Sequence, residues 1–277
     1  GNEKNRRKRL NDLSIKWKDF YKNVFALVVP MALQNLINVG VTAADVVMLG
    51  KVSEKVLSGA SLAGQIQYIM VLFLFGLTSG ATVLTAQYWG KGDKTAIEKI
   101  LALGIRSAVI ITAIFTIAAF TIPASLMRIF TNDPQVIAEG VKYLRIVACS
   151  YIIMGITNVY LYVMRSIERV IVATVVYLVS FLCNVVFNAI FIFGLFGFPA
   201  LGIRGAAIAT LIARIMELVL VCGYAKIYNK DVKFRVHYFL HQDKLLVRDF
   251  LVYSLPVVLN EVMWGLGTSA NTAVLGH

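Results

Sequence analysis

Charge is scarce in this chain of 277 residues, of which 15% are Asp, Glu, Lys or Arg and 58% are apolar. A soluble domain carries about 25% charged and about 45–50% apolar residues. The apolar excess is concentrated in runs longer than about 18 residues with few charges, which are typical of membrane-spanning helices. Because lipid leaves no partner for unpaired backbone groups, each run should be helical. The composition therefore excludes an ordinary soluble domain and predicts an all-α integral membrane protein.

Motifs for catalysis and for metal binding are also missing. The sequence contains three cysteines and three histidines, with no CxxC pair and no Cys/His cluster. It has no Walker motif, no Gly-rich nucleotide loop and no Ser/His/Asp set. We therefore expect neither an enzyme nor a bound cofactor. The net charge of +12 comes from basic residues between the apolar runs, so it predicts membrane topology and no nucleic-acid partner.

The apolar runs divide the chain into six complete spans and the beginning of a seventh. We expect a basic tail over 1–23, a six-helix lobe over 24–228, a linker over 229–245 and the start of a second lobe over 246–277. The second half of the tail is compatible with a short helix along the membrane surface, anchored by Ile15, Trp17 and Phe20. The expected spans are 24–49, 58–89, 95–122, 134–164, 170–196 and 203–228, with the seventh beginning near 246 and the fourth opened by Asp133-Pro134.

The distribution of basic residues predicts the orientation. The tail and the loops at 90–99, 165–169 and 226–248 together hold 18 Lys and Arg residues, whereas the opposite set of connections holds four. The positive-inside rule therefore places the N-terminus in the cytoplasm of a multi-pass protein, which we expect in a bacterial cell membrane. After six complete spans the chain returns to that side, so the seventh span would enter in the same direction as the first.

The end of the chain repeats its first span. Residues 256–277 align without a gap on residues 30–51, with six identities in 22 pairs, including the prolines and the final Leu-Gly. Since the two copies would have the same orientation, the repeat is a parallel one, as in transporters whose halves are related by an axis along the membrane normal. The repeat predicts one lobe followed by the start of another.

Polar side chains inside the first span point to a site. Gln34, Asn38, Thr42 and Asp45 fall within an arc of about 80° on a helix. A carboxylate at the depth of Asp45 costs several kcal/mol unless it is protonated, paired or hydrated. Two interpretations stay open: an ion- or proton-binding carboxylate facing a central cavity, or a carboxylate neutralised by an arginine from another helix.

Later spans carry further polar residues. Candidates for the same cavity are Tyr177, Asn184 and Asn188 in the fifth span and Trp264 in the seventh, with Glu261 at the edge of its face. The asparagines could coordinate sodium or bond across helices. In the sixth span Arg214 and Glu217 have the spacing of a pair that neutralises itself. Arg106, Lys142 and Arg145 could line the cavity or extend to a membrane surface.

Three stretches together resemble the multidrug and toxic compound extrusion (MATE) transporters. The first reads N-x3-N-x5-G-x2-G-x-P-x2-G-x2-G-x4-T from Asn184 to Thr210. The second is DVVMLG at 45–50, fifteen residues after Pro30, and the third is QYWGKGD at 87–93. The resemblance covers about 24 to 277. It implies a twelve-helix secondary transporter of two six-helix lobes, of which this chain holds the first lobe and the start of the seventh helix.

The resemblance also implies a function. Family members export cationic, amphipathic organic molecules in exchange for sodium ions or protons, and Asp45 would be the coupling carboxylate of the first lobe. Asn184, Asn188 and Thr210 would surround the ion, with Na+ possible at Asp45, Asn184 and Asn188. The family often has an acidic residue at the Asn188 position, so the amide here leaves one fewer charge. A seventh-helix glutamate is common in the family about one turn further from the proline, where this sequence has Trp264, which makes Glu261 its candidate counterpart.

Alternatives remain at this point. The expected partners are the lipid bilayer, a cationic small molecule and a second lobe, supplied either by a longer chain or by a second copy in a half-transporter; a degraded product without transport activity is a third interpretation. A flippase for lipid-linked sugars, with Arg106, Arg145 and Arg214 binding diphosphate, or a metabolite exporter of related fold would also fit. A non-transporting isolated lobe belongs to another class. The substrate and the choice between sodium and proton are not encoded in any motif that we recognise.

Overall fold

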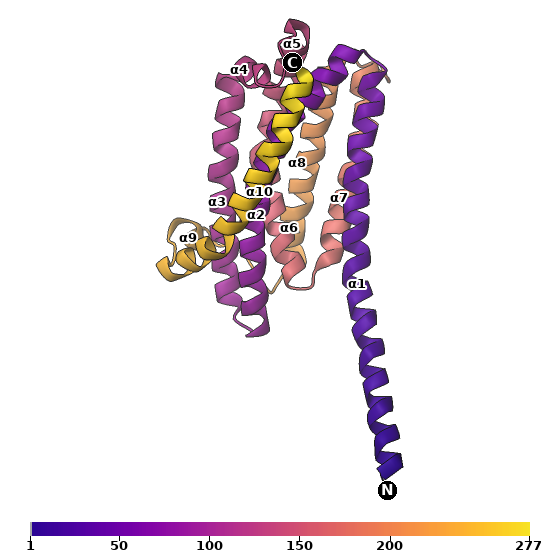
Figure 1. Cartoon of the computed structure of the whole chain (residues 1–277), viewed down its shortest axis with the longest axis vertical. Helices are drawn as coiled ribbons and strands as arrows, with labels where there is room; N and C mark the ends of the chain where they lie inside the picture. Colours follow the sequence, from indigo (N-terminus) through magenta and orange to yellow (C-terminus); the bar gives the residue numbers. More distant parts are fainter. Residues whose placement is uncertain (1) are drawn as a thin grey trace.

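The computed structural model describes the backbone from residue 2 to residue 277 and the side chains of residues 3–5 and 16–277. Over this range every element is helical (Figure 1). The elements are α1 (Asn2–Gly50), α2 (Glu54–Gly90), α3 (Lys94–Thr121), α4 (Pro123–Arg128), α5 (Pro134–Val147), η1 (Ala148–Ser150), α6 (Tyr151–Ser166), α7 (Val170–Phe193), α8 (Ile203–Ile227), α9 (Val236–Leu240) and α10 (Lys244–Gly276).

Within the described residues, seven helices are long and apolar enough to cross a membrane, in agreement with the predicted segments. The fourth span is α5 and α6 joined through the tighter 3-10 turn η1, and it runs from Pro134 to Ser166. Its first turn begins as the sequence predicts, since the Asp133 side chain accepts a hydrogen bond from the Gln135 backbone N–H at 2.9 Å and proline follows at the first helical position. The all-α fold of six spans and a further helix is confirmed.

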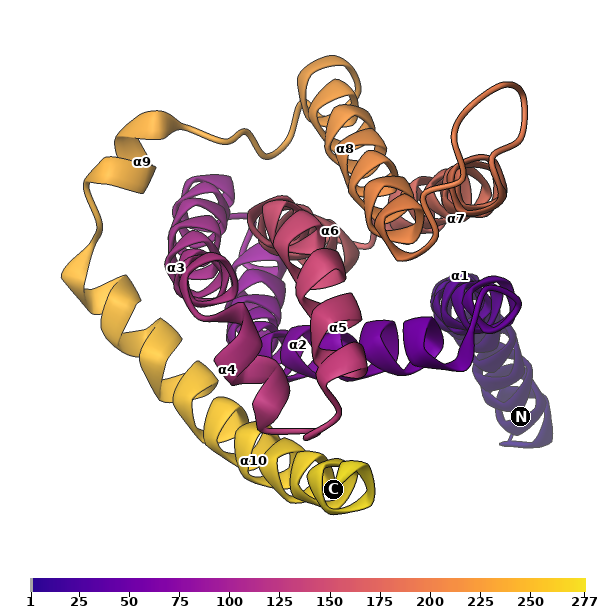
Figure 2. The ribbon, with the colours of Figure 1, turned by 90° about the horizontal axis from the view of Figure 1, so that it is seen from above.

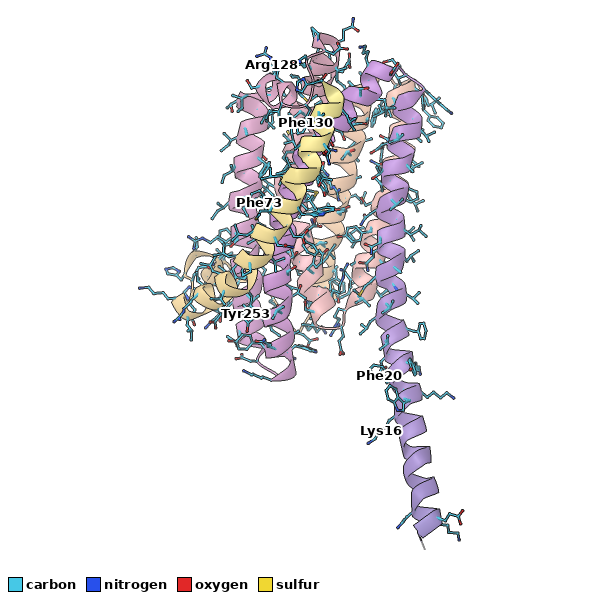
Figure 3. All side chains as sticks on the ribbon, in the orientation of Figure 1. Lys16, Phe20, Phe73, Arg128, Phe130 and Tyr253 are labelled. Carbon is cyan, nitrogen blue, oxygen red and sulfur yellow. The ribbon has the colours of Figure 1, made fainter. Side chains whose placement is uncertain are left out.

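The N-terminal segment differs from the prediction of a separate surface helix. It forms one unbroken helix with the first span, and α1 projects far beyond the bundle (Figure 1). Figure 3 shows Lys16 and Phe20 on the projecting part, where Trp17 and Phe20 are exposed. The physical reason is the lack of any Gly or Pro between residues 2 and 29, so nothing interrupts the backbone hydrogen bonds. The side chain of Ile15 lies outside the described ones.

Seen from above, the helices divide into two sides (Figure 2). On one side α7 packs against α8 and α1; on the other α2 packs against α3 and α10. Buried side chains of α2, α3, α5 and α6 form the main core between them. A smaller apolar cluster joins the end of α1 to the start of α2 and to the α7–α8 turn, through Leu49, Val56, Ala60, Ile192, Ile203 and Ala206. This second cluster positions the part of α1 that carries Asp45.

Candidate functional site

Asp45 lies where α1 meets α7, and its carboxylate has a partner there. The side-chain amide of Asn188 donates a hydrogen bond of 2.5 Å to Asp45 Oδ1. Asn188 is fully buried and Asp45 is half-buried. A hydrogen bond to an ionised carboxylate is stronger than one between neutral groups. Asp45 is therefore held by an amide of α7.

The polar contact continues through α7 to α8. Asn188 lies one turn after Asn184, and its amide also donates to Asn184 Oδ1 at 3.1 Å. The amide of Asn184 lies 3.5 Å from Thr210 Oγ1 on α8. The structure thus brings the four residues predicted for ion coupling into one chain of contacts across three helices.

One oxygen in this group has no partner. Asn188 Oδ1 is buried and accepts no hydrogen bond from any residue that the structure describes. A buried acceptor without a donor costs about 1–3 kcal/mol. Asp45, Asn184 and Thr210 contribute the other oxygens nearby. A cation bound among these oxygens would satisfy the free acceptor, so the donor set fits a hard cation such as sodium.

Two glycines of the α7–α8 connection make this arrangement possible. Gly194 ends α7 in the left-handed conformation, with φ of 73°, which a side chain disfavours. Gly205, in the first turn of α8, lies so close to the Phe191 carbonyl that a Cβ would overlap it. The backbone N–H of Leu201 donates to the same Phe191 carbonyl at 2.8 Å. The glycine pattern therefore brings α8 back against α7, with Thr210 opposite Asn184.

The other polar residues of α1 do not share the environment of Asp45. Asn38 and Thr42 are exposed, and the Thr42 hydroxyl donates only to the Asn38 carbonyl of its own helix, at 3.3 Å. Asp45 lies about 20° from Gln34 around the helix, whereas Asn38 and Thr42 turn away by about 40° and about 80°. The predicted common face thus splits into a side that packs on α7 and an exposed side.

Gln34 is buried and fully engaged. Its amide donates to Thr174 Oγ1 at 2.9 Å and to the Val170 carbonyl at 3.2 Å, and its oxygen accepts a hydrogen bond from Arg165. Gln34 therefore joins α1 to the start of α7, and the structure does not place it on a cavity. The sequence does not identify Arg165 and Thr174 as partners of Gln34, because Arg165 counts there only as a basic residue of the 165–169 loop.

The polar residues of α7 lie in two different surroundings. Tyr177 is buried and its hydroxyl donates to Asn158 Oδ1 of α6 at 3.3 Å, away from Asp45. The Ser180 hydroxyl donates to Glu217 at 2.7 Å. Arg214 donates to both oxygens of Glu217, at 3.0 and 3.1 Å, so the predicted pair is formed in α8. Among these polar residues of α7, only Asn184 and Asn188 belong to the chain of contacts that begins at Asp45.

Glu261 and Trp264 lie apart from Asp45. Both belong to α10, which packs against α2 and α3, and Figure 2 shows α10 and the α7–α8 pair on opposite sides of the molecule. Trp264 is 64% exposed and Glu261 is half-buried. The structure therefore does not bring these two candidates to the site on α1, although the sequence repeat equates the two helices.

The arginines considered for diphosphate binding are dispersed. Arg214 forms an ion pair with Glu217. Arg106 is exposed on α3, where it donates a hydrogen bond to the Phe239 carbonyl at 3.4 Å. Arg145 is exposed on α5. Lys142 on the same helix pairs with Glu139 at 3.2 Å. The described residues thus give each of these cations its own surroundings and do not form one cationic pocket from them.

Comparison with known proteins agrees with this architecture. A "probable multidrug resistance protein NorM" of Thermotoga maritima is 28% identical over 198 residues, covering 70% of this chain and 42% of that protein. A protein of the same name from Rhizobium meliloti is 27% identical over 210 residues, covering 76% of this chain and 45% of that one. The chain thus spans about half the length of the curated relatives it matches.

Solved structures share the fold. A transporter of the MOP superfamily from Pyrococcus furiosus superposes with a TM-score of 0.78 at 20% identity, over 87% of this chain and 52% of that one. A multidrug resistance MATE transporter in an inward-facing conformation gives 0.73 at 19% identity, over 88% and 55%. A family model described as MatE matches residues 30–190, more than half of the chain. This chain is accordingly a member of the MATE family of membrane transporters, and it corresponds to one lobe of such a protein.

Proposed function

We propose that the protein is a secondary active antiporter that exports cationic, amphipathic organic compounds in exchange for Na+ or H+. Asp45 is the residue that binds the coupling ion. The observation that carries the proposal is the contact of Asp45 with Asn188, which places a carboxylate between two membrane-spanning helices. The names of the relatives as probable multidrug resistance proteins support the substrate class.

The coupling follows from the charge of this carboxylate. Ionised Asp45 attracts the Asn188 amide and a cation, and neutralisation by a proton or a sodium ion weakens the first interaction. The packing of α1 against α7 then changes in relative free energy. Exchange requires the ion and the exported compound to prefer opposite states of the protein, because a ligand with equal affinity for both shifts nothing.

Sodium and proton make different demands on the site. A proton requires Asp45 alone. Sodium requires several oxygens, which Asp45, Asn184, Asn188 and Thr210 provide. The Asn188 Oδ1 atom supports sodium, because a bound cation would give this buried acceptor a partner.

Transport also requires a second lobe. The relatives are about twice as long, and residues 256–277 repeat the first span in the same direction. We therefore assign 24–228 to the first lobe, 229–245 to the linker and 246–277 to the beginning of the second lobe, which a longer chain or a second copy completes. The basic residues of 226–248 and of the tail support a cytoplasmic N-terminus.

The test is efflux of a fluorescent lipophilic cation from cells that express the natural gene product. We expect Asp45→Asn to lower efflux by roughly 5–150-fold, the range of typical coupling free energies, at unchanged protein level in the membrane. Asp19→Asn is the matched control, because Asp19 is exposed and lies in α1 between Lys16 and Phe20, which Figure 3 shows outside the bundle. Separate sodium and proton gradients then identify the ion. Full efflux by the Asp45 variant would refute the coupling role, and no efflux by the wild type would refute the substrate class.

A further inference from the structure

The segment between α8 and α10 exposes two kinds of side chain together. Large apolar side chains are exposed at Ile227, Tyr228, Phe234, Val236, Leu240 and Leu245. Cations are exposed among them at Lys226, Lys230, Lys233, Lys244 and Arg248. In water, such apolar exposure is unfavourable and marks an interaction surface. A mixture of basic and apolar side chains in one segment is typical of chains that lie in the membrane interface.

The contacts of α3 place α9 at the depth of that interface. Arg106, whose guanidinium donates to the Phe239 carbonyl, lies 12 residues after Lys94 and 15 residues before Thr121. The second separation corresponds to about 22 Å of helix, at 1.5 Å per residue. With a hydrocarbon layer of about 30 Å, Arg106 lies about 8 Å inside the near boundary when Thr121 is at the far one. A long arginine side chain extends over most of that distance. The Phe239 carbonyl, and α9 with it, therefore lies close to the boundary.

Ion pairs fix the inner side of the segment against the bundle. Asp231 pairs with Lys94 at 2.9 Å and also with Arg169. Glu98 accepts hydrogen bonds from the Lys233 backbone N–H at 3.1 Å and from Arg235 Nε at 2.8 Å. Val232 is fully buried between these pairs. Asp231, Glu98 and Arg235 thus pair with charged groups of the protein itself.

The remaining cations face away from it. No described residue forms an ion pair with Lys230, Lys233 or Lys244. Figure 2 shows α9 outside the bundle beside α3, with no helix beyond it. The segment therefore exposes more positive than negative charge at the level where lipid headgroups lie, since Asp243 is its one exposed carboxylate.

We propose that residues 226–248 form a docking surface for anionic phospholipids of the adjacent leaflet. Lys230, Lys233 and Lys244 bind the headgroups, and Val236 and Leu240 enter the acyl-chain boundary. Charge complementarity decides the occupant, because each Lys or Arg near an anionic surface contributes about 1 kcal/mol of attraction. This surface binds the segment between the two lobes to the membrane, independently of the ion site on α1.

The test uses the full-length protein in lipid nanodiscs. Val236→Cys receives an environment-sensitive fluorophore after all native cysteines, including the three of this sequence, are replaced by alanine. Acrylamide quenching is compared between discs of phosphatidylcholine and discs in which about a third of the lipid is phosphatidylglycerol. We expect quenching at least about twofold weaker in the anionic discs, and we expect about 0.5 M NaCl to remove the difference by screening. Equal quenching in both discs would overturn the proposal.

A charge-matched pair of variants separates this surface from net charge. Lys230→Gln, Lys233→Gln and Lys244→Gln combined should remove the protection by anionic lipid. Lys51→Gln, Arg128→Gln and Arg204→Gln combined change the net charge equally at the opposite end of the bundle, where Figure 3 shows Arg128. This control should retain the protection. Loss of protection in both triple variants, or in neither, would contradict a surface built by residues 226–248.

Discussion

Asp45 of α1 and Asn188 of α7 form a hydrogen bond of 2.5 Å, eleven residues along α1 from the contact of Gln34 with Thr174. The two contacts join the same pair of helices about 16 Å apart. The Gln34 contact is between neutral groups, whereas the Asp45 contact involves a group that changes its charge. Under the proposed function, binding of an ion would change the Asp45 contact and leave the contact of Gln34 with Thr174 in place.

The pair of Arg214 and Glu217 gives a prediction for stability. Glu217 is only 2% exposed and receives hydrogen bonds from Arg214 and Ser180. Glu217→Gln leaves the Arg214 charge without its counter-ion, and we expect a loss of about 3–5 kcal/mol in stability. The double variant Arg214→Met with Glu217→Leu should recover most of it, because no charge is then buried. Thermal unfolding in detergent, followed by intrinsic fluorescence, measures both. Equal loss in the single and double variants would show that the pair is needed for more than charge balance.

The packing of α10 on α2 depends on a glycine. A Cβ at Gly76 would lie 2.7 Å from Val258 Cα and 2.8 Å from its backbone nitrogen. Gly76→Ala must therefore displace the backbone of α10, at a cost of about 1–3 kcal/mol. We expect faster hydrogen exchange in α10 and a lower unfolding temperature. Gly64→Ala is the control in the same helix, since a Cβ there meets nothing within 4 Å. If both variants behave alike, helix propensity and not the α2–α10 contact is responsible.

Asp231 predicts a pH dependence at the start of the linker. The hydrogen bond from Lys94 is the main cause that lowers the pKa of Asp231 from its ordinary value of 3.8. A lowered pKa means that the ionised pair stabilises the fold at pH values above 3.8 and loses this effect as the pH falls through the lowered pKa. Asp231→Asn should thus speed hydrogen exchange at Val232 at neutral pH.

The difference between this variant and the wild type should shrink in acid and vanish below the lowered pKa, because protonated Asp231 resembles the asparagine. Comparing both proteins at each pH removes the intrinsic change in exchange rate. Asp249→Asn is the control, for which no ion pair is present among the described residues. A difference between Asp231→Asn and the wild type that persists at low pH would assign the effect to packing and not to charge.

Local patterns were sufficient to predict the spans. Long apolar runs require helices in lipid, and Asp133-Pro134 specifies a helix start by its own chemistry. The tail, whose second half is compatible by sequence with a short surface helix, continues the helix of the first span instead, because no Gly or Pro interrupts the chain there. Asn184, Asn188 and Thr210 were predicted to lie near Asp45 from the family resemblance, whose motif includes the glycine spacing of the α7–α8 turn.

Contacts between distant segments could not be predicted from the sequence. Gln34 meets Arg165 and Thr174 across 131 and 140 residues, and helical periodicity carries no information about such partners. For the same reason Glu261 and Trp264 were candidates for the same cavity as Asp45, although close packing of α10 on Gly76 takes them to α2. A repeat in sequence predicts equivalent helices but not adjacent ones.

Thr210 provides the sharpest test of the coupling ion. Its hydroxyl oxygen lies 3.5 Å from the Asn184 amide, at the α8 end of the polar chain that begins at Asp45. Thr210→Val keeps the shape of the side chain and removes this oxygen. Loss of one ligand should raise the sodium concentration for half-maximal efflux by about tenfold, which corresponds to about 1.4 kcal/mol. Efflux driven by a proton gradient should not change, because protonation requires only Asp45.

The control for this variant is Thr121→Val, which removes an exposed hydroxyl at the end of α3 that bonds only to Ile117 of its own helix. It should leave both ion dependences as in the wild type. An unchanged sodium dependence in Thr210→Val would exclude Thr210 as a sodium ligand and leave Asp45, Asn184 and Asn188 as the ligand residues. The amide at position 188 cannot add a second negative charge. Without the Thr210 oxygen, sodium would be bound by Asp45 and two asparagine oxygens alone, whereas a proton requires only Asp45. The substitution therefore affects sodium-driven efflux and not proton-driven efflux.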